Sequence, residues 1–186
     1  TADLGAIIGD IVVKDSGKNT WYISLKDVNG ATFSSYSGAA SLFDATGTLQ
    51  PDSAGAKFLK SFGVDLNKVQ KGFDERNGIK RRRPTIPITP PDRTEMKAIF
   101  ERAWGMNYFY VRKINGTDWK VFWMSKAKLN SLSDNMTVTK VNYPNPGSKQ
   151  ITIFCSTTSA DYTIELRNSK AQEYPNDTKF KITRLK

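Results

Sequence analysis

The feature that most constrains the fold of this chain is a pair of strand-like runs near its start. Residues 7–14 and 20–26 are rich in isoleucine, valine, tryptophan and tyrosine, and the short polar segment 15–19 (Asp-Ser-Gly-Lys-Asn) separates them. Two β-prone runs joined by so short a turn-rich segment predict a β-hairpin. We therefore expect the fold to begin with two antiparallel strands.

The register of this hairpin decides which side chains share a face. Alternation along the second strand puts its polar residues on one face (Tyr22, Ser24, Lys26) and its other apolar residues on the opposite face (Trp21, Ile23, Leu25). Asp10 joins the face of Ser24 only if the numbers of paired residues sum to 34, which a three-residue or five-residue loop gives. A two-residue or four-residue loop pairs Asp10 with Ile23 instead. The sequence leaves both registers open.

The remaining sequence alternates between helical and strand-like patterns. Helices are predicted over residues 34–44, 54–62, 65–76, 92–104 and 125–132, and strands over 107–114, 119–124, 137–143, 150–155, 162–167 and 179–183. These patterns indicate an α+β fold with a mixed central sheet, flanking helices and a β-rich C-terminal half.

A basic, proline-rich segment divides the chain in two. Residues 78–93 are expected to form a linker between an N-terminal α/β part, residues 1–77, and a β-rich part, residues 94–186. Because neither part is long enough to be called independent, we expect them to pack together as one domain.

The chain contains no histidine, which excludes several classes of enzyme. Serine–histidine and cysteine–histidine hydrolases, histidine-ligated zinc enzymes and histidine-dependent nucleases all need an imidazole. The single cysteine, Cys155, excludes an internal disulfide and a cysteine-rich zinc site, and its strand-like surroundings predict a buried, unreactive thiol. The chemistry that remains is that of carboxylates, lysine, tyrosine and serine, most naturally with a hard cation such as Mg²⁺.

The net charge of +10 indicates a polyanionic partner, foremost nucleic acid. The densest basic cluster consists of Lys80, Arg81, Arg82 and Arg83. It is either an arm that follows a phosphate backbone or a solvated linker. Arg112 and Lys113 lie among aromatic residues, as expected where bases stack and phosphates are neutralised, although core packing explains most of these rings equally well.

No apolar run approaches the roughly 18 residues that a membrane helix needs, and the start of the chain lacks the layout of a signal peptide. We therefore expect no membrane partner and a cytoplasmic location, in the host cytoplasm if a phage encodes the protein.

Asp10 on one strand and Lys26 on the next resemble the PD-(D/E)xK motif of the restriction-endonuclease-like nucleases. In that family an Asp and an acidic-x-Lys triplet on neighbouring strands hold one or two divalent metal ions, and the lysine positions or activates the attacking water. The resemblance implies Asp10 as a metal ligand, Ser24 at the acidic position and Lys26 as the catalytic lysine, within a restriction-endonuclease-like core. It covers residues 7–27, and the phrase Trp-Tyr-Ile-Ser-Leu-Lys is similar to nucleases of phages and mobile elements.

Ser24 departs from the family motif, because a hydroxyl brings no negative charge to a metal site. Affinity for Mg²⁺ should fall unless another carboxylate substitutes for the missing one, and Asp27, Asp3 and Glu165 are the candidates. Glu165 and Arg167 also share a face of one predicted strand, which favours a surface ion pair over a metal ligand and a phosphate clamp.

The resulting hypothesis is a DNA endonuclease that depends on Mg²⁺ or Mn²⁺ and hydrolyses phosphodiester bonds. RNA stays open as an alternative substrate, and cutting both strands at a symmetric site would favour a homodimer. Two other classes compete with this one: a nucleic-acid-binding module without catalysis, and a structural or assembly protein of a virus.

Overall fold

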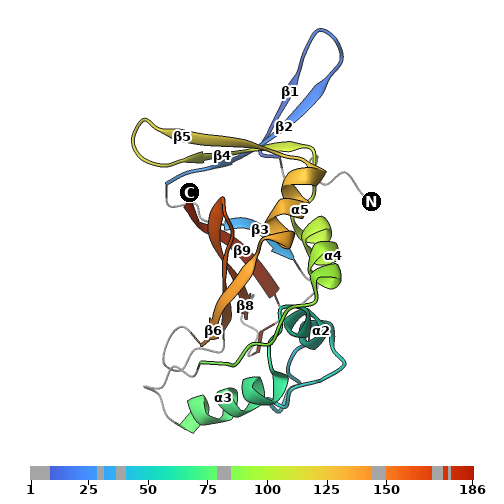
Figure 1. Cartoon of the computed structure of the whole chain (residues 1–186), viewed down its shortest axis with the longest axis vertical. Coiled ribbons are helices and arrows are strands. Elements are labelled where there is room, and N and C mark those ends of the chain that lie inside the picture. Colours follow the sequence, from blue (N-terminus) through green and yellow to red (C-terminus); the bar gives the residue numbers. More distant parts are fainter. Residues whose placement is uncertain are drawn as a thin grey trace.

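The computed structural model describes residues 9–28, 32–36, 41–78, 85–143, 150–168, 174–175 and 177–186, without the side chains of residues 32–36 and 75–78. These residues form an α+β fold, which confirms the predicted class at that level (Figure 1). The helices are α2 (Ala54–Ser61), α3 (Leu66–Gly78), α4 (Arg93–Trp104) and α5 (Lys126–Asp134). The strands are β1 (Ile11–Lys14), β2 (Thr20–Lys26), β3 (Thr32–Tyr36), β4 (Tyr108–Lys113), β5 (Trp119–Met124), β6 (Thr137–Asn142), β7 (Ile151–Ser156), β8 (Ala160–Arg167) and β9 (Asp177–Leu185).

The strands form two sheets rather than one central sheet. The first has the order β1-β2-β4-β5 and is mixed, because β2 and β4 run parallel while its other neighbours are antiparallel. The second has the order β3-β9-β8-β7-β6 and is antiparallel throughout. Strands from both sides of the expected linker therefore contribute to both sheets.

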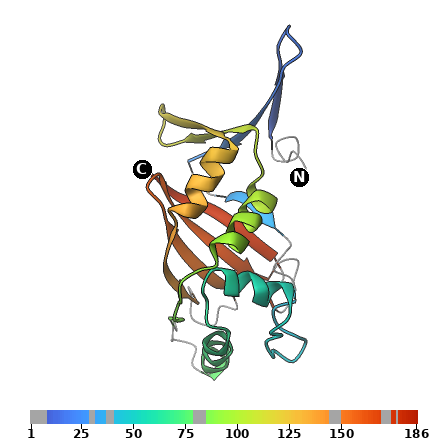
Figure 2. The ribbon, with the colours of Figure 1, turned by 45° about the vertical axis from the view of Figure 1, so that its right-hand side comes forward.

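Helices α2, α4 and α5 lie across one face of the five-stranded sheet, and the main core lies between them (Figure 2). Aromatic side chains fill this core: the Trp104 ring lies 4.7 Å from Phe100, 5.4 Å from Tyr162 and 5.7 Å from Phe180, measured between ring centroids. Cys155 is buried here too, as expected, and burial raises the pKa of its thiol well above the usual range. A protonated thiol in such surroundings is unreactive.

The predicted helix over residues 34–44 is wrong. Residues 32–36 form β3, which pairs with β9 at the edge of the second sheet, and residues 41–50 form a loop with a bridge between Phe43 and Leu49. The backbone groups at the edge of β9 supply partners that a short run of serine and small residues, poor in strong helix formers, does not supply for itself.

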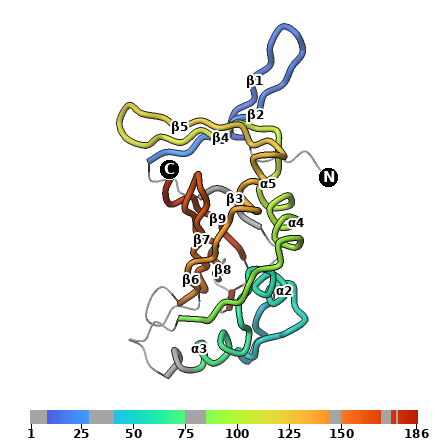
Figure 3. The backbone as a smooth tube through the Cα atoms, in the orientation of Figure 1, coloured from blue at the N-terminus to red at the C-terminus, as the bar shows by residue number. Residues whose placement is uncertain are grey.

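The described part of the expected linker packs against the fold. Figure 3 traces residues 85–92 from their bridge to β6 up to the start of α4, and the Ile86 N–H donates to the carbonyl of Val141 at 2.8 Å. Ile86 is buried. Lys80, Arg81, Arg82 and Arg83 lie outside the described residues.

Among the helices described, none combines the length and the apolar character that crossing a bilayer requires.

Candidate active site

The β1–β2 hairpin adopts the register that brings the predicted site together. Ile11 pairs with Ile23 and Lys14 with Thr20, so the numbers of paired residues sum to 34, and a five-residue loop joins the strands. The carboxylate of Asp15 closes this loop by accepting the Asn19 backbone N–H at 2.9 Å and its amide group at 2.7 Å. The side-chain hydrogen bond from Asn19 lowers the pKa of Asp15, because it favours the charged carboxylate.

Asp10 lies immediately before β1 and contacts four successive residues of β2. Its N–H donates to the Ile23 carbonyl at 2.8 Å, one residue out of step with the register of the paired strands. Its Oδ2 accepts the Leu25 N–H at 2.7 Å, the Lys26 ammonium at 3.2 Å and the Ser24 hydroxyl at 3.4 Å. The residues proposed from the sequence, Asp10, Ser24 and Lys26, therefore converge on one oxygen atom.

The three side chains differ in their access to solvent. Ser24 is fully buried, the Lys26 side chain is 18% exposed and the Asp10 side chain is 49% exposed. The half-exposed carboxylate of Asp10 can contact a ligand from solvent, while the buried Ser24 hydroxyl and the neighbouring Lys26 ammonium hold the carboxylate in position. The arrangement can orient a phosphate or a water molecule next to a positive charge.

The described residues include no group of three or more histidine, cysteine, aspartate and glutamate side chains placed to hold a metal ion. Of the three candidates for the second acid, Asp27 accepts the N–H of its neighbour Val28 at 2.7 Å, and Asp3 lies outside the described residues. Glu165 lies in the other sheet and pairs with Lys181 at 2.6 Å. Asp10 thus offers a cation one carboxylate.

The predicted ion pair between Glu165 and Arg167 is wrong. Glu165 pairs with Lys181, and Arg167 pairs with Asp177 at 3.1 Å, so both partners lie on β9. The reason is geometric, because side chains two positions apart on a strand are separated by about 7 Å, whereas those on neighbouring strands approach to about 5 Å.

A row of three cations crosses the first sheet on the face that carries the candidate site. The register places Lys26 of β2 opposite Arg112 of β4, and Arg112 opposite Lys120 of β5. We call these three residues the cation row. The Arg112 guanidinium donates to the Ile182 carbonyl in the second sheet, and its buried Nε has no hydrogen-bond partner among the described residues.

Arg112 and Lys113, both proposed from the sequence to bind nucleic acid, point to opposite faces of β4. The Lys113 ammonium lies 5.7 Å from the centre of the Trp119 ring on the outer face. Lys120, another basic residue among these aromatic side chains, lies beside Arg112 because the Asn115-Gly116 turn forms the predicted β4–β5 hairpin.

Aromatic side chains cluster on the outer face of the first sheet. Trp21, Phe109 and Trp123 contact one another there, with ring centroids 4.8–6.2 Å apart, and both tryptophans are more than a third exposed. On the inner face Tyr110 is buried beside Arg112, and burial raises the pKa of its hydroxyl to about 12 although the Arg112 charge acts in the opposite direction. The two faces of this sheet thus differ sharply in polarity.

Comparison of the chain with protein-family models, with curated proteins and with solved structures finds no match.

Proposed function

We propose that this chain is a DNA endonuclease that hydrolyses phosphodiester bonds with the help of Mg²⁺ or Mn²⁺. The observation that carries the proposal is the convergence of Asp10, Ser24 and Lys26 on one face of the β1–β2 hairpin, in the register that the resemblance requires. A restriction-endonuclease-like core belongs to the proposal. Its support is the mixed sheet, in which the hairpin continues into the parallel strand β4.

Each residue of the cluster has a role that its contacts support. The Leu25 N–H and the Ser24 hydroxyl hold the Asp10 carboxylate in place, and Ser24 does so from a fully buried position. Lys26 brings a positive charge to the half-exposed carboxylate, where it can face a scissile phosphate or the water that attacks it. These positions are fixed by strand pairing, so they are organised before DNA binds.

The residues fit a divalent cation as a site with one protein carboxylate. Mg²⁺ is commonly held by one or two carboxylates together with substrate phosphates and water, so Asp10 would act as its protein ligand once DNA is present. When bound, such an ion lowers the pKa of its water and offsets charge that develops on the phosphate. Because only one acid among the described residues contributes, we expect weak binding of the metal in the absence of DNA.

A second candidate is a nucleic-acid-binding module without catalysis. The observation that favours it is that the Asp10–Lys26 pair and the buried Ser24 already satisfy one another, as a purely structural hairpin end would. The net charge and the cation row support a nucleic-acid partner in either case.

Nicking and linearisation of supercoiled plasmid DNA in Mg²⁺ or Mn²⁺ tests the proposal. Asp10→Ala and Lys26→Ala should each lower the cleavage rate by about 10² to 10⁴. Lys14→Ala, which removes a positive charge from the same hairpin, is the matched control and should keep the rate within about threefold.

DNA binding in EDTA separates the two candidates. Asp10→Ala should retain binding, since it removes a negative charge from the site. Wild-type protein that binds DNA in a salt-dependent manner, yet cleaves neither DNA nor RNA with either metal, would establish the binding module instead.

A further inference from the structure

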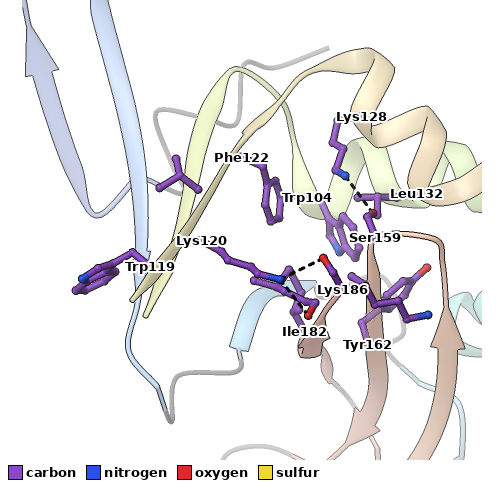
Figure 4. Close-up of a pocket in the computed structure, with 13 residues that line it drawn as sticks. Trp104, Trp119, Lys120, Phe122, Lys128, Leu132, Ser159, Tyr162, Ile182 and Lys186 are labelled. Atoms are coloured by element: carbon purple, nitrogen blue, oxygen red, sulfur yellow. Dashed lines mark hydrogen bonds between the residues drawn. The ribbon is translucent and has the colours of Figure 1, made fainter. Parts of the chain in front are cut away.

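A cavity of about 370 Å³ opens beside the cation row, on the inner face of β5. Figure 4 shows Phe122 and Lys120 projecting from β5 toward the end of the second sheet, with Lys128 of α5 above them and Trp104 behind. This volume lies at the lower end of the range for sites that bind small molecules. Neither the proposed cleavage chemistry nor the core of the protein uses this space.

The interior of the cavity is aromatic and apolar. Trp104, Tyr162 and Ile182 line it and are each at most 3% exposed, so they form a rigid floor. Phe122 forms a wall that is only partly buried, and its ring is braced by Tyr110 at a centroid distance of 4.9 Å. A flat apolar group of a ligand could lie against this braced ring.

The mouth of the cavity is cationic. The Lys128 ammonium lies 5.3 Å from the centre of the Phe122 ring and donates to the Ser159 hydroxyl at 3.0 Å. Lys120 donates to the main-chain oxygen atoms of Leu185 and Lys186. The acceptor for Lys128 is an uncharged hydroxyl, so its positive charge can still attract an anion. The cavity therefore suits a ligand with a flat apolar body and a negatively charged end.

The cation row connects this cavity with the Asp10–Lys26 site. Lys26 and Lys120 lie two strands apart, roughly 10 Å, which is the axial rise of about three nucleotides in one B-form strand. Between them lies the Arg112 guanidinium, which donates to the Ile182 carbonyl of the second sheet and completes the row of positive charges.

We propose that this cavity binds one nucleotide of the substrate strand, with the base against Phe122 and the adjoining phosphate between Lys120 and Lys128. The inference rests on the proposed function, since it assumes that a DNA strand is bound at Lys26. It adds a base-binding subsite on the same face of the sheet, a few nucleotides from the scissile phosphate. Stacking on an aromatic ring tolerates any base, so this subsite would grip an unpaired nucleotide with little sequence preference.

Binding of single-stranded oligonucleotides in EDTA tests the subsite without any cleavage. Wild-type protein should bind an intact ten-nucleotide strand about tenfold more tightly than an abasic strand of equal length. Phe122→Leu should remove this difference by weakening binding of the intact strand alone. Phe109→Leu, which changes the outer face of the same sheet, is the matched control and should preserve the difference.

The salt dependence of binding tests the cationic mouth. Lys128→Gln should reduce the slope of log K against log salt concentration by about 0.7, the value for one phosphate contact to a single strand. Lys140→Gln is the matched control, because that ammonium also lies over a ring, Phe154, but in the second sheet. An unchanged slope for Lys128→Gln would overturn the assignment of the phosphate.

The outcomes for the subsite and for the nuclease are separable. Equal binding of intact and abasic strands by wild-type protein overturns the subsite, whereas plasmid cleavage that depends on Asp10 would still support the nuclease. Loss of the intact-strand preference in Phe122→Leu supports the subsite even if no plasmid is cleaved. Binding of thymidine monophosphate that Phe122→Leu abolishes, without any preference for intact strands, would assign the cavity to a free nucleotide and overturn its place on the substrate strand.

Discussion

Compensated deletions in the hairpin test whether the face on which Asp10 lies decides activity. Deleting Val13 from β1, while the five-residue loop holds the strand ends together, shifts the partner of Ile11 from Ile23 to Tyr22. The residues before the deletion, Asp10 included, then turn to the opposite face of the sheet. Deleting Thr20 as well restores the pairing of Ile11 with Ile23. Cleavage should be lost in the first variant and recovered in the second.

The change in register should lower the free energy of unfolding only slightly, so a loss of cleavage can be separated from a loss of folding. Ile11, Val12 and Val13 are 43–52% exposed, so exchanging their faces buries or exposes little apolar surface. The main loss is the hydrogen bond from the Leu25 N–H to Asp10, worth about 1–2 kcal/mol for a partly exposed, charge-assisted bond. The expected loss of cleavage, about 10² to 10⁴, corresponds to roughly 3–5 kcal/mol of transition-state stabilisation.

The assay combines plasmid cleavage with urea denaturation of the same variants. A variant lacking Val13 that unfolds within about 2 kcal/mol of wild type and does not cleave DNA agrees with the reasoning. If that variant cleaves within threefold of the wild-type rate, Asp10 does not act from the face of Ser24 and Lys26, and the site is refuted.

Three further outcomes are expected. Gly63→Ala should destabilise the fold by about 3 kcal/mol or more in urea denaturation, because its Cβ would lie 2.0 Å from the Thr89 carbonyl oxygen at a φ of +75°; a loss below 1 kcal/mol would contradict this. Ser24→Asp should place a second carboxylate beside that of Asp10. Mg²⁺ should therefore raise the unfolding temperature of the Ser24→Asp variant but not that of the Ser24→Asn variant. The pKa of Tyr110 is about 12 in the folded protein and about 10 in the unfolded chain, so the neutral hydroxyl favours folding fully below pH 10. The free energy of unfolding should therefore fall by about 2–3 kcal/mol as the pH rises to 12. Urea denaturation at pH 9 and pH 11.5 should show this loss, and Tyr110→Phe should reduce it.

Local signals in the sequence predicted most of the elements. Ser53, Asp92 and Ser125 each accept a backbone N–H of the first helical turn, and the first two lie in segments that also marked helix starts in the sequence. Gly105 ends α4 with a positive φ of 66°, as a C-terminal glycine commonly does. These signals work because their partners lie within four residues along the chain.

Pairings between strands far apart in the chain could not be predicted from the sequence. The parallel pairing of β2 with β4 joins segments more than 80 residues apart, and the strand β3 forms only because β9 offers an edge. The candidate site divides in the same way. Asp10, Ser24 and Lys26 follow from one local hairpin, whereas Lys120 joins them only through the non-local strand pair.

The cation row can bind a nucleic-acid strand in both candidate functions. Like charges directly opposite one another on neighbouring strands repel. Each cation of the row has a different partner: Lys26 pairs with Asp10, Arg112 donates to a carbonyl of β9, and Lys120 donates to main-chain oxygens. The acceptor of Arg112 is an uncharged carbonyl, so the positive charge of Arg112 remains for a polyanion to neutralise. Binding of a nucleic-acid strand there relieves repulsion that folding alone leaves in place, and it should therefore stabilise the protein whether or not Asp10 supports cleavage. Cleavage that depends on Asp10 and Lys26 distinguishes the nuclease from the binding module.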